Sequence, residues 1–284
     1  MSDNDLQSAL RSMRDDWDSR ARENARHYIA TLRDEWDDET FFASGEQELA
    51  NQVLNDMGNI CQGREPGSMR VLEIGCGAAR VTRALARVFG EVHAVDISSE
   101  MIARARAALS TQPNAFVYLG NGMDLSVIPN VPFDFVFSRY VFQHIPILNI
   151  IENYFKEVAR LLRPGALFKV QVQGRPVQDS VPPGNAVATM PEPTPELPFF
   201  WKLTGRIPLA VRKKLLRPLR GLLTREAAEA PTDVTASSVL PINTWVGAML
   251  TPQNTKNLCD ESGFELRYQR GAGEVEYWLW CFKK

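Results

Sequence analysis

An apolar, strand-like run in this chain ends in VLEIGCG, which places Glu73, Gly75 and Gly77 at its carboxyl end. A strand that turns sharply into a helix presents backbone N–H groups and the positive end of a helix dipole to a ligand. Glycine is needed where a Cβ would collide with that ligand, or where the turn itself demands it. The pattern therefore predicts a ligand-binding turn after the first strand.

The residues around this turn indicate which ligand it takes. EVHAVDIS places Asp96 at the end of the next strand, where an acid can accept hydrogen bonds from ribose hydroxyls. Arg80 stands where the dinucleotide pattern Gly-x-Gly-x-x-Gly has its third glycine, and Glu73 would repel a phosphate. Glu73 suits a cationic amino group instead. Adenine, ribose and an ammonium-bearing tail are combined in S-adenosylmethionine, which we expect in preference to NAD.

Strands alternating with helices must position these residues. From residue 70 onward the apolar runs are RVLEIG, EVHAVD, AFVYLG, FDFVFS and ALFKVQV. Helical stretches separate them at 79–89, 99–110 and 147–162. This order indicates βαβ units and a parallel sheet that is buried on both faces. Further along, a helix at 251–262 precedes two runs that are typical of an antiparallel pair.

Five motifs in order resemble the class I S-adenosylmethionine-dependent methyltransferases: VLEIGCGAARVTRALA, VHAVDISSEMIARAR, YLGNGMDL, FDFVFSRYVFQHI and EVARLLRPGALFKVQV. The resemblance covers about residues 70–173. It implies a doubly wound α/β fold with a seven-stranded, mostly parallel sheet, whose last two strands come from 264–270 and 274–282. It also implies S-adenosyl-L-methionine as the cofactor and methyl transfer as the reaction.

The resemblance implies cofactor contacts at the strand ends of this sheet. The residues expected there are Glu73, Gly75, Cys76, Gly77, Arg80, Asp96, Ile97, Met101, Asn121, Gly122, Met123 and Ser138. Glu73 is expected beside the methionine part, Asp96 at the ribose, and Ile97 and Met101 on either side of the adenine. Asn121 stands where relatives often have an acid; its amide oxygen can accept from the adenine amino group, and Asp124 is the alternative.

The stretch SRYVFQHI follows the fourth strand, at the sheet edge where ligands collect in open α/β folds. Tyr140 and His144 are its candidate catalytic residues. An imidazole, with an ordinary pKa of about 6.5, suits a general base. The alternative is that His144 packs in the turn before Pro146. Methyl transfer needs no strong base, because a sulfonium is already activated and alignment can supply much of the rate.

Residues 1–62 are expected to form an N-terminal helical lid. The polar, helix-prone sequence at 4–39 carries aromatic side chains at roughly helical spacing, and 45–57 predicts a second helix. We expect this lid to cap the cofactor; the alternative is that its aromatic residues only dock the helix on the sheet. Its candidate cofactor-binding residues are Tyr28, Phe42, Ser44 and Gly45.

The core at 63–173 is followed by a different region at 174–241 and by a C-terminal completion of the sheet at 242–284. The region 174–241 holds eleven of the chain's eighteen prolines, which a sheet cannot accommodate. We expect it to be an inserted helical and proline-rich cap over the substrate. Within it, 198–225 carries eight Lys or Arg and no acid. That run fits a solvated helix pair, a cover for the acceptor or a peripheral contact with an anionic membrane.

Composition limits the classes of function. The formal net charge of −2 gives no bulk electrostatic case for nucleic-acid binding, and no motif of nucleic-acid methylation follows the fourth strand. The four cysteines show no paired spacing, so we expect neither a metal site nor a disulfide framework. An acidic N-terminus and the lack of an apolar run of about 18 residues indicate a cytoplasmic protein.

The residues and the resemblance together predict transfer of a methyl group to O, N or C of a small organic acceptor. Two alternatives stay open. The same chemistry could act on a lipid or isoprenoid at a membrane surface, or the chain could bind the cofactor without turnover. The sequence identifies neither the acceptor nor the oligomeric state.

Overall fold

The computed structural model describes residues 3–30, 35–175, 187–190 and 247–284. These residues belong to one compact unit formed by Met1–Glu196 and Ile242–Lys284. A second unit, Leu197–Pro241, lies outside the described residues. Most of the expected cap at 174–241, and all of its basic run 198–225, therefore lies outside them too.

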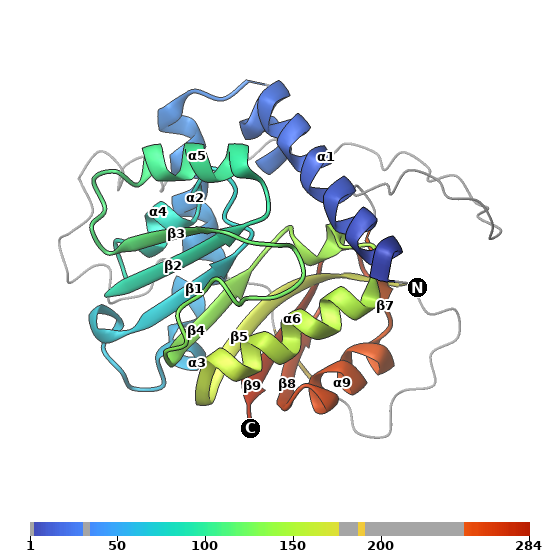
Figure 1. The fold of residues 1–284 in the computed structure, drawn as a ribbon. Coiled ribbons are helices and arrows are strands. Elements are labelled where there is room, and N and C mark those ends of the chain that lie inside the picture. The colour runs from blue at the N-terminus through green and yellow to red at the C-terminus, as the bar shows by residue number, and fades with distance from the viewer. Residues whose placement is uncertain (1–2, 31–34, 176–186, 191–246) are drawn as a thin grey trace, which may run out of the picture. The chain divides into compact units, whose positions relative to one another are not determined.

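A nine-stranded sheet forms the centre of the described unit, in the order β3-β2-β1-β4-β5-β9-β8-β6, with β7 paired to β5 (Figure 1). Its strands are β1 Arg70–Ile74, β2 Glu91–Asp96, β3 Ala115–Leu119, β4 Phe133–Ser138, β5 Leu162–Gly174, β6 Ala188–Thr189, β7 Met249–Leu250, β8 Phe264–Arg270 and β9 Tyr277–Lys283. Strands β1 to β5 pair in parallel, whereas β9 is antiparallel to both of its neighbours. The predicted mostly parallel α/β fold is confirmed, and the two-residue strands β6 and β7 were not expected.

Helices cover both faces of this sheet. In Figure 1, α6 and α9 lie across the front of the sheet and α2 lies behind it. The helices are α1 Asp3–Ile29, α2 Asp38–Gln52, α3 Met57–Cys61, α4 Thr82–Leu85, α5 Ser99–Ala108, α6 Leu148–Leu161 and α9 Pro252–Glu261, with 3₁₀ turns η1 Leu54–Asp56, η2 Pro66–Ser68 and η3 Phe142–His144. Among these described helices, none combines the length and apolar character needed to cross a membrane.

Strand alternation decides which side chains reach which face. Leu72 and Ile74 of β1 join the apolar core under α6 and α9, so Glu73 between them points to the opposite face. The strand order changes direction at β1, because β2 and β3 lie on one side of β1 and β4 and β5 lie on the other. Ligands of open α/β sheets bind at such a reversal, beyond the carboxyl ends of the strands.

The N-terminal helices differ from the prediction in their limits. Helix α1 ends at Ile29 and is interrupted at Asn24, whose φ of −160° and ψ of 82° are not helical. The Asn24 side chain accepts from the backbone N–H of His27 and so begins a new turn. Helix α2 begins earlier than expected because Asp37 caps it, accepting from Thr40 N at 2.7 Å.

A buried lysine ties the end of α2 to the sheet. Lys169 of β5 is 2% exposed, and its Nζ donates to the carbonyl of Gln52 at 2.6 Å and to Asp56 Oδ2 at 2.7 Å. The Nζ also lies 4.5 Å from the ring centroid of Trp280, whose indole N–H donates to the same carboxylate. Arg270 adds a bond to the Gln52 side chain. Burial lowers the pKa of Lys169 to about 8.

This shift gives a testable dependence of stability on pH. Between pH 8 and the ordinary value of 10.5, the unfolded chain holds the Lys169 proton more tightly than the folded chain. The contribution of this group to the free energy of unfolding therefore rises with pH across that window, by up to about 3 kcal/mol. Chemical denaturation at pH 8 and pH 10 measures the free energy of unfolding of the parent and of Lys169→Met. The difference between the two proteins should be larger at pH 10, and an equal difference at both pH values would contradict the shift.

Candidate functional site

The turn after β1 has the tight geometry that its glycines predict. Gly75 and Gly77 have φ values of 78° and 51°, which L side chains rarely adopt. A Cβ on Gly75 would lie 2.0 Å from Val141, and one on Gly77 would lie 2.9 Å from Ile29 of α1. The expectation was that a ligand approaches these glycines; in the structure the close approaches come from protein side chains.

Glu73 and Arg80 form the charged end of the site. Glu73 is 5% exposed and accepts from the Thr82 hydroxyl at 2.6 Å. Burial raises the pKa of its carboxyl to about 7. Arg80 is 8% exposed, and burial lowers its pKa. Its Nη1 donates to the backbone and side-chain oxygens of Ser44, whereas its Nε has no hydrogen-bond partner among the described residues.

Asp96 closes the end of β2 beside the same turn. Its Oδ2 accepts from Gly77 N at 2.8 Å and its Oδ1 accepts from Ser98 N at 2.9 Å. Burial raises the pKa of this carboxyl. Backbone donors thus fix the orientation of the carboxylate while its remaining acceptor capacity stays available to a ligand.

A single cavity collects these groups and leaves about 1010 Å³ of empty space, open solvent at its mouth included. The residues predicted as site residues that line it are Tyr28, Glu73, Gly75, Cys76, Gly77, Arg80, Asp96, Ile97, Met101, Gly122, Tyr140 and His144. The structure therefore brings the ends of β1, β2 and β4 together with the C-terminal turn of α1.

Six predicted residues do not line this cavity. Ser138 is fully buried and donates to the carbonyl of Ile74, which ties β4 to β1. Asn121 holds its own turn by accepting from Met123 N and Asp124 N. Met123 lies in the same turn as Asn121, and its carbonyl accepts from the Asn153 side chain. The other three belong to α2: the Phe42 ring packs under Arg83, Ser44 bonds to Arg80, and a Cβ on Gly45 would lie 1.9 Å from the Arg80 carbonyl oxygen.

Helix α1 is held over the cavity through one carboxylate. Asp18 accepts from the Ser98 hydroxyl at 2.5 Å, from the Ser99 hydroxyl at 3.0 Å and from Glu100 N at 3.2 Å. It thereby supplements the cap of α5, whose N-cap is Ser98. This anchor sits one residue from Trp17, which lines the cavity.

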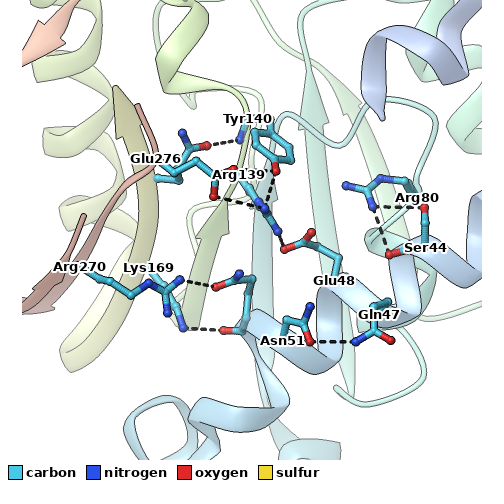
Figure 2. Close-up of polar contacts among 12 residues, drawn as sticks. Ser44, Gln47, Glu48, Asn51, Arg80, Arg139, Tyr140, Lys169, Arg270 and Glu276 are labelled. Carbon is cyan, nitrogen blue, oxygen red and sulfur yellow. Dashed lines mark hydrogen bonds and ion pairs between the residues drawn. The ribbon is translucent and has the colours of Figure 1, made fainter. Parts of the chain in front are cut away.

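The carboxyl end of β4 carries a second polar cluster. Arg139 pairs with Glu48 of α2 and lies 3.5 Å from Glu276, and its guanidinium covers the Tyr140 ring at 4.2 Å. Figure 2 shows these side chains pointing toward one another. The Tyr140 hydroxyl donates to Glu276 at 3.1 Å, and burial raises its pKa. Tyr140 is therefore a hydrogen-bond donor at neutral pH.

His144 lies beside this cluster, in η3. It is 9% exposed, and its ring meets Trp17 edge to face with centroids 5.3 Å apart. Its Nε2 lies 3.1 Å from the side-chain amide nitrogen of Gln143. His144 is thus both packed and exposed to the cavity, so the two sequence-based alternatives for it are not exclusive.

Some lining residues were not assigned from the sequence. Met13 and Trp17 lie four residues apart on α1 and therefore share one helix face. This spacing is the sequence feature that could have identified them as lining residues. Ile29, Val141 and Tyr154 also line the cavity. They carry no chemical signal in the sequence, because an apolar lining residue has the composition of an ordinary core residue.

Part of the chain is similar to known methyltransferases. Residues 71–165 match the family described as Methyltransferase domain. The chain is 33% identical to phosphoethanolamine N-methyltransferase 2 of Caenorhabditis elegans over 137 residues. These residues make up 48% of this chain and 30% of that protein. Over 109 residues it is 30% identical to a ubiquinone biosynthesis O-methyltransferase of Bradyrhizobium diazoefficiens, 38% of this chain and 42% of that protein. The chain spans less than half the length of these two relatives.

A solved structure extends the likeness beyond the matched domain. Magnesium protoporphyrin IX methyltransferase from Synechocystis PCC 6803, solved with bound SAH, matches 95% of this chain and 98% of its own, with a TM-score of 0.54 and 14% identity. At that identity the likeness shows the fold. Residues 71–165 therefore carry a methyltransferase domain by the family match, and the sheet around them has the fold of the class I S-adenosylmethionine-dependent methyltransferases.

Proposed function

We propose that this chain transfers a methyl group from S-adenosyl-L-methionine to a small organic acceptor. The observation that carries the proposal is the placement of two carboxylates, the buried Glu73 and the partly buried Asp96, at adjacent strand ends on one cavity. When bound, S-adenosyl-L-methionine supplies a methyl group already activated on a sulfonium.

The residues at the charged end fit such a cofactor. Glu73 would hold its ammonium group, because a buried carboxylate gains most from an opposite charge. Arg80, whose Nε has no partner among the described residues, would hold its carboxylate. Asp96 would accept from the ribose hydroxyls, with Ile97 and Met101 beside the adenine.

One wall of the cavity would face the acceptor. Trp17, Tyr140 and His144 line the cavity, and the Tyr140 hydroxyl is already committed to Glu276. These groups exclude water and orient an acceptor atom rather than activate it strongly, which suits a reaction in which alignment lowers the barrier. The two curated relatives are named for transfer to nitrogen and to oxygen, so O, N and C acceptors stay within the proposal.

Loss of the ribose acceptor should weaken cofactor binding. Asp96→Asn is expected to lower the affinity for S-adenosylhomocysteine about 5- to 150-fold, since a charged hydrogen-bond acceptor is worth about 1–3 kcal/mol. Isothermal titration calorimetry measures this affinity, and NAD should not compete with S-adenosylhomocysteine. Asp134→Asn is the control: this buried carboxylate bonds to Arg70 N at the amino end of β4, away from the cavity. Equal losses in both variants, or no binding by the parent at millimolar ligand, would overturn the proposal.

Binding should also be linked to protons through Glu73. With a pKa raised to about 7, its carboxyl is largely protonated below that pH in the ligand-free protein, and a bound ammonium favours the ionised form. Affinity for S-adenosylhomocysteine should therefore fall as pH decreases below 7, by up to about tenfold per pH unit. Calorimetry in two buffers of different ionisation enthalpy counts the released protons. Glu73→Gln should abolish this release; an unchanged release in that variant would assign it to another group.

A further inference from the structure

A chain of side-chain amides connects the backbone of Tyr140 to the ring of His144. The Tyr140 N–H donates to Gln171 Oε1 at 2.8 Å. Gln171 Nε2 lies 2.6 Å from Gln143 Oε1, and Gln143 Nε2 lies 3.1 Å from His144 Nε2. Two glutamines thus relay a hydrogen bond from β5 to the wall of the cavity.

The direction of this relay follows from chemistry alone. A backbone N–H can only donate, so the Gln171 atom that faces Tyr140 must be the carbonyl oxygen. The amide nitrogen of Gln171 faces the carbonyl oxygens of Val172 at 3.3 Å and Val275 at 3.5 Å, which supports the same orientation independently. Gln171 must then donate to Gln143, and Gln143 must use its own NH₂ group toward the imidazole.

We propose that Gln143 and Gln171 are positioning residues that hold His144 as a neutral imidazole with its proton on Nδ1. The ring nitrogen Nε2 accepts from the Gln143 amide, so it must carry a lone pair. A second proton at Nε2 would oppose the NH₂ group of Gln143. Turning Gln143 over would then set its NH₂ group against that of Gln171, which is held in place because the Tyr140 N–H can only donate. The network therefore disfavours His144 as a base acting through Nε2.

The backbone on both sides of the relay is held firmly. Tyr140 has a φ of 58°, a strained value for a residue with a side chain, and its N–H is fixed by Gln171, which is fully buried. At the other end, the carbonyl of Gln143 accepts from Gly247 N at 2.7 Å. A Cβ on Gly247 would lie 2.5 Å from that carbonyl oxygen, so the two segments are in close contact.

The consequence for catalysis rests on the proposed function. An Nδ1–H imidazole offers a hydrogen-bond donor and two ring faces, and Trp17 packs against the ring. A ring held in this way orients an acceptor by packing against it rather than by taking its proton. It performs no proton transfer, which matches a reaction that depends on alignment.

The chain contains an internal reference for the opposite tautomer. His93 is one of only three histidines, and its Nε2 lies 2.6 Å from Glu91 Oε1 while its Nδ1 lies 3.0 Å from the Tyr118 hydroxyl. A carboxylate cannot donate, so His93 must carry a proton on Nε2. Burial lowers the pKa of His93, which favours its neutral form. The two rings should therefore give opposite patterns of nitrogen signals.

Long-range ¹H–¹⁵N NMR of the full chain at pH 8 tests the tautomer directly. We expect a protonated Nδ1 and a bare Nε2 for His144, and the reverse for His93, with His144→Gln assigning the signals. In Gln171→Glu the carboxylate can only accept, so Gln143 should turn its NH₂ group toward residue 171. The Gln143 carbonyl oxygen would then face the imidazole, and His144 should carry its proton on Nε2. Gln143→Glu should protonate Nε2 as well, at a less buried position that tolerates charge better. A parent His144 with its proton on Nε2 would overturn the proposal.

A matched control separates the relay from the effect of an added charge. Gln173 lies two residues from Gln171 on β5 and is 9% exposed, and Gln173→Glu places the same charge nearby without touching the relay. It should leave the His144 signals unchanged. If it shifts them as the relay variants do, the relay does not set the tautomer.

Ligand binding distinguishes this proposal from the wider function. The relay variants should bind S-adenosylhomocysteine within about threefold of the parent while the His144 tautomer changes, because the relay touches neither Glu73 nor Asp96. If the parent fails to bind the ligand but shows the expected tautomer, the methyltransferase proposal fails and the relay stands. If binding is intact and the relay variants leave the tautomer unchanged, the relay fails and the methyltransferase proposal stands.

Discussion

The site depends on placing two like charges, those of the buried Glu73 and the partly buried Asp96, at the ends of neighbouring strands. Burial raises the pKa of both carboxyls, so the ligand-free protein holds them at a cost. Asp96 is partly compensated by the backbone N–H groups of Gly77 and Ser98, and Glu73 by the Thr82 hydroxyl. A cationic ligand that reaches Glu73 removes part of the remaining cost, so the same feature that weakens the empty fold selects the ligand.

The opposite problem, buried cations, is solved where α2 crosses the sheet. Arg139 and Lys169 point from β4 and β5 into an apolar layer that includes Trp278 and Trp280. The α2–η1 segment supplies one acidic partner for each cation: Glu48 pairs with Arg139, and Asp56 pairs with Lys169. Removing one partner of such a pair costs more than the pair contributes, so the position of α2 is strongly specified. Through Ser44, α2 also orients Arg80 at the cavity.

Sequence patterns predicted the seven longer strands, the turn after β1 and the acid at the end of β2, because each is encoded within a few consecutive residues. They could not predict the relay to His144. Gln171 reads as one more residue of a buried strand, and it meets Tyr140 only because β4 and β5 pair with Ser138 opposite Val170. Similarly, the side chain of Ile29 that fills the space at Gly77 arrives from a helix 48 positions away in the chain. Register and tertiary approach lie beyond local patterns.

One serine links Asp96 to the helix that carries Trp17. The N–H of Ser98 fixes Asp96, and its hydroxyl donates to Asp18 of α1. Asp18 is adjacent to Trp17, and Trp17 packs edge to face on His144. The group expected to hold the ribose and the ring proposed to face the acceptor are therefore separated by a short series of contacts. Because α1 is fixed at the N-terminus of α5, its aromatic residues take their positions from the same loop that orients Asp96.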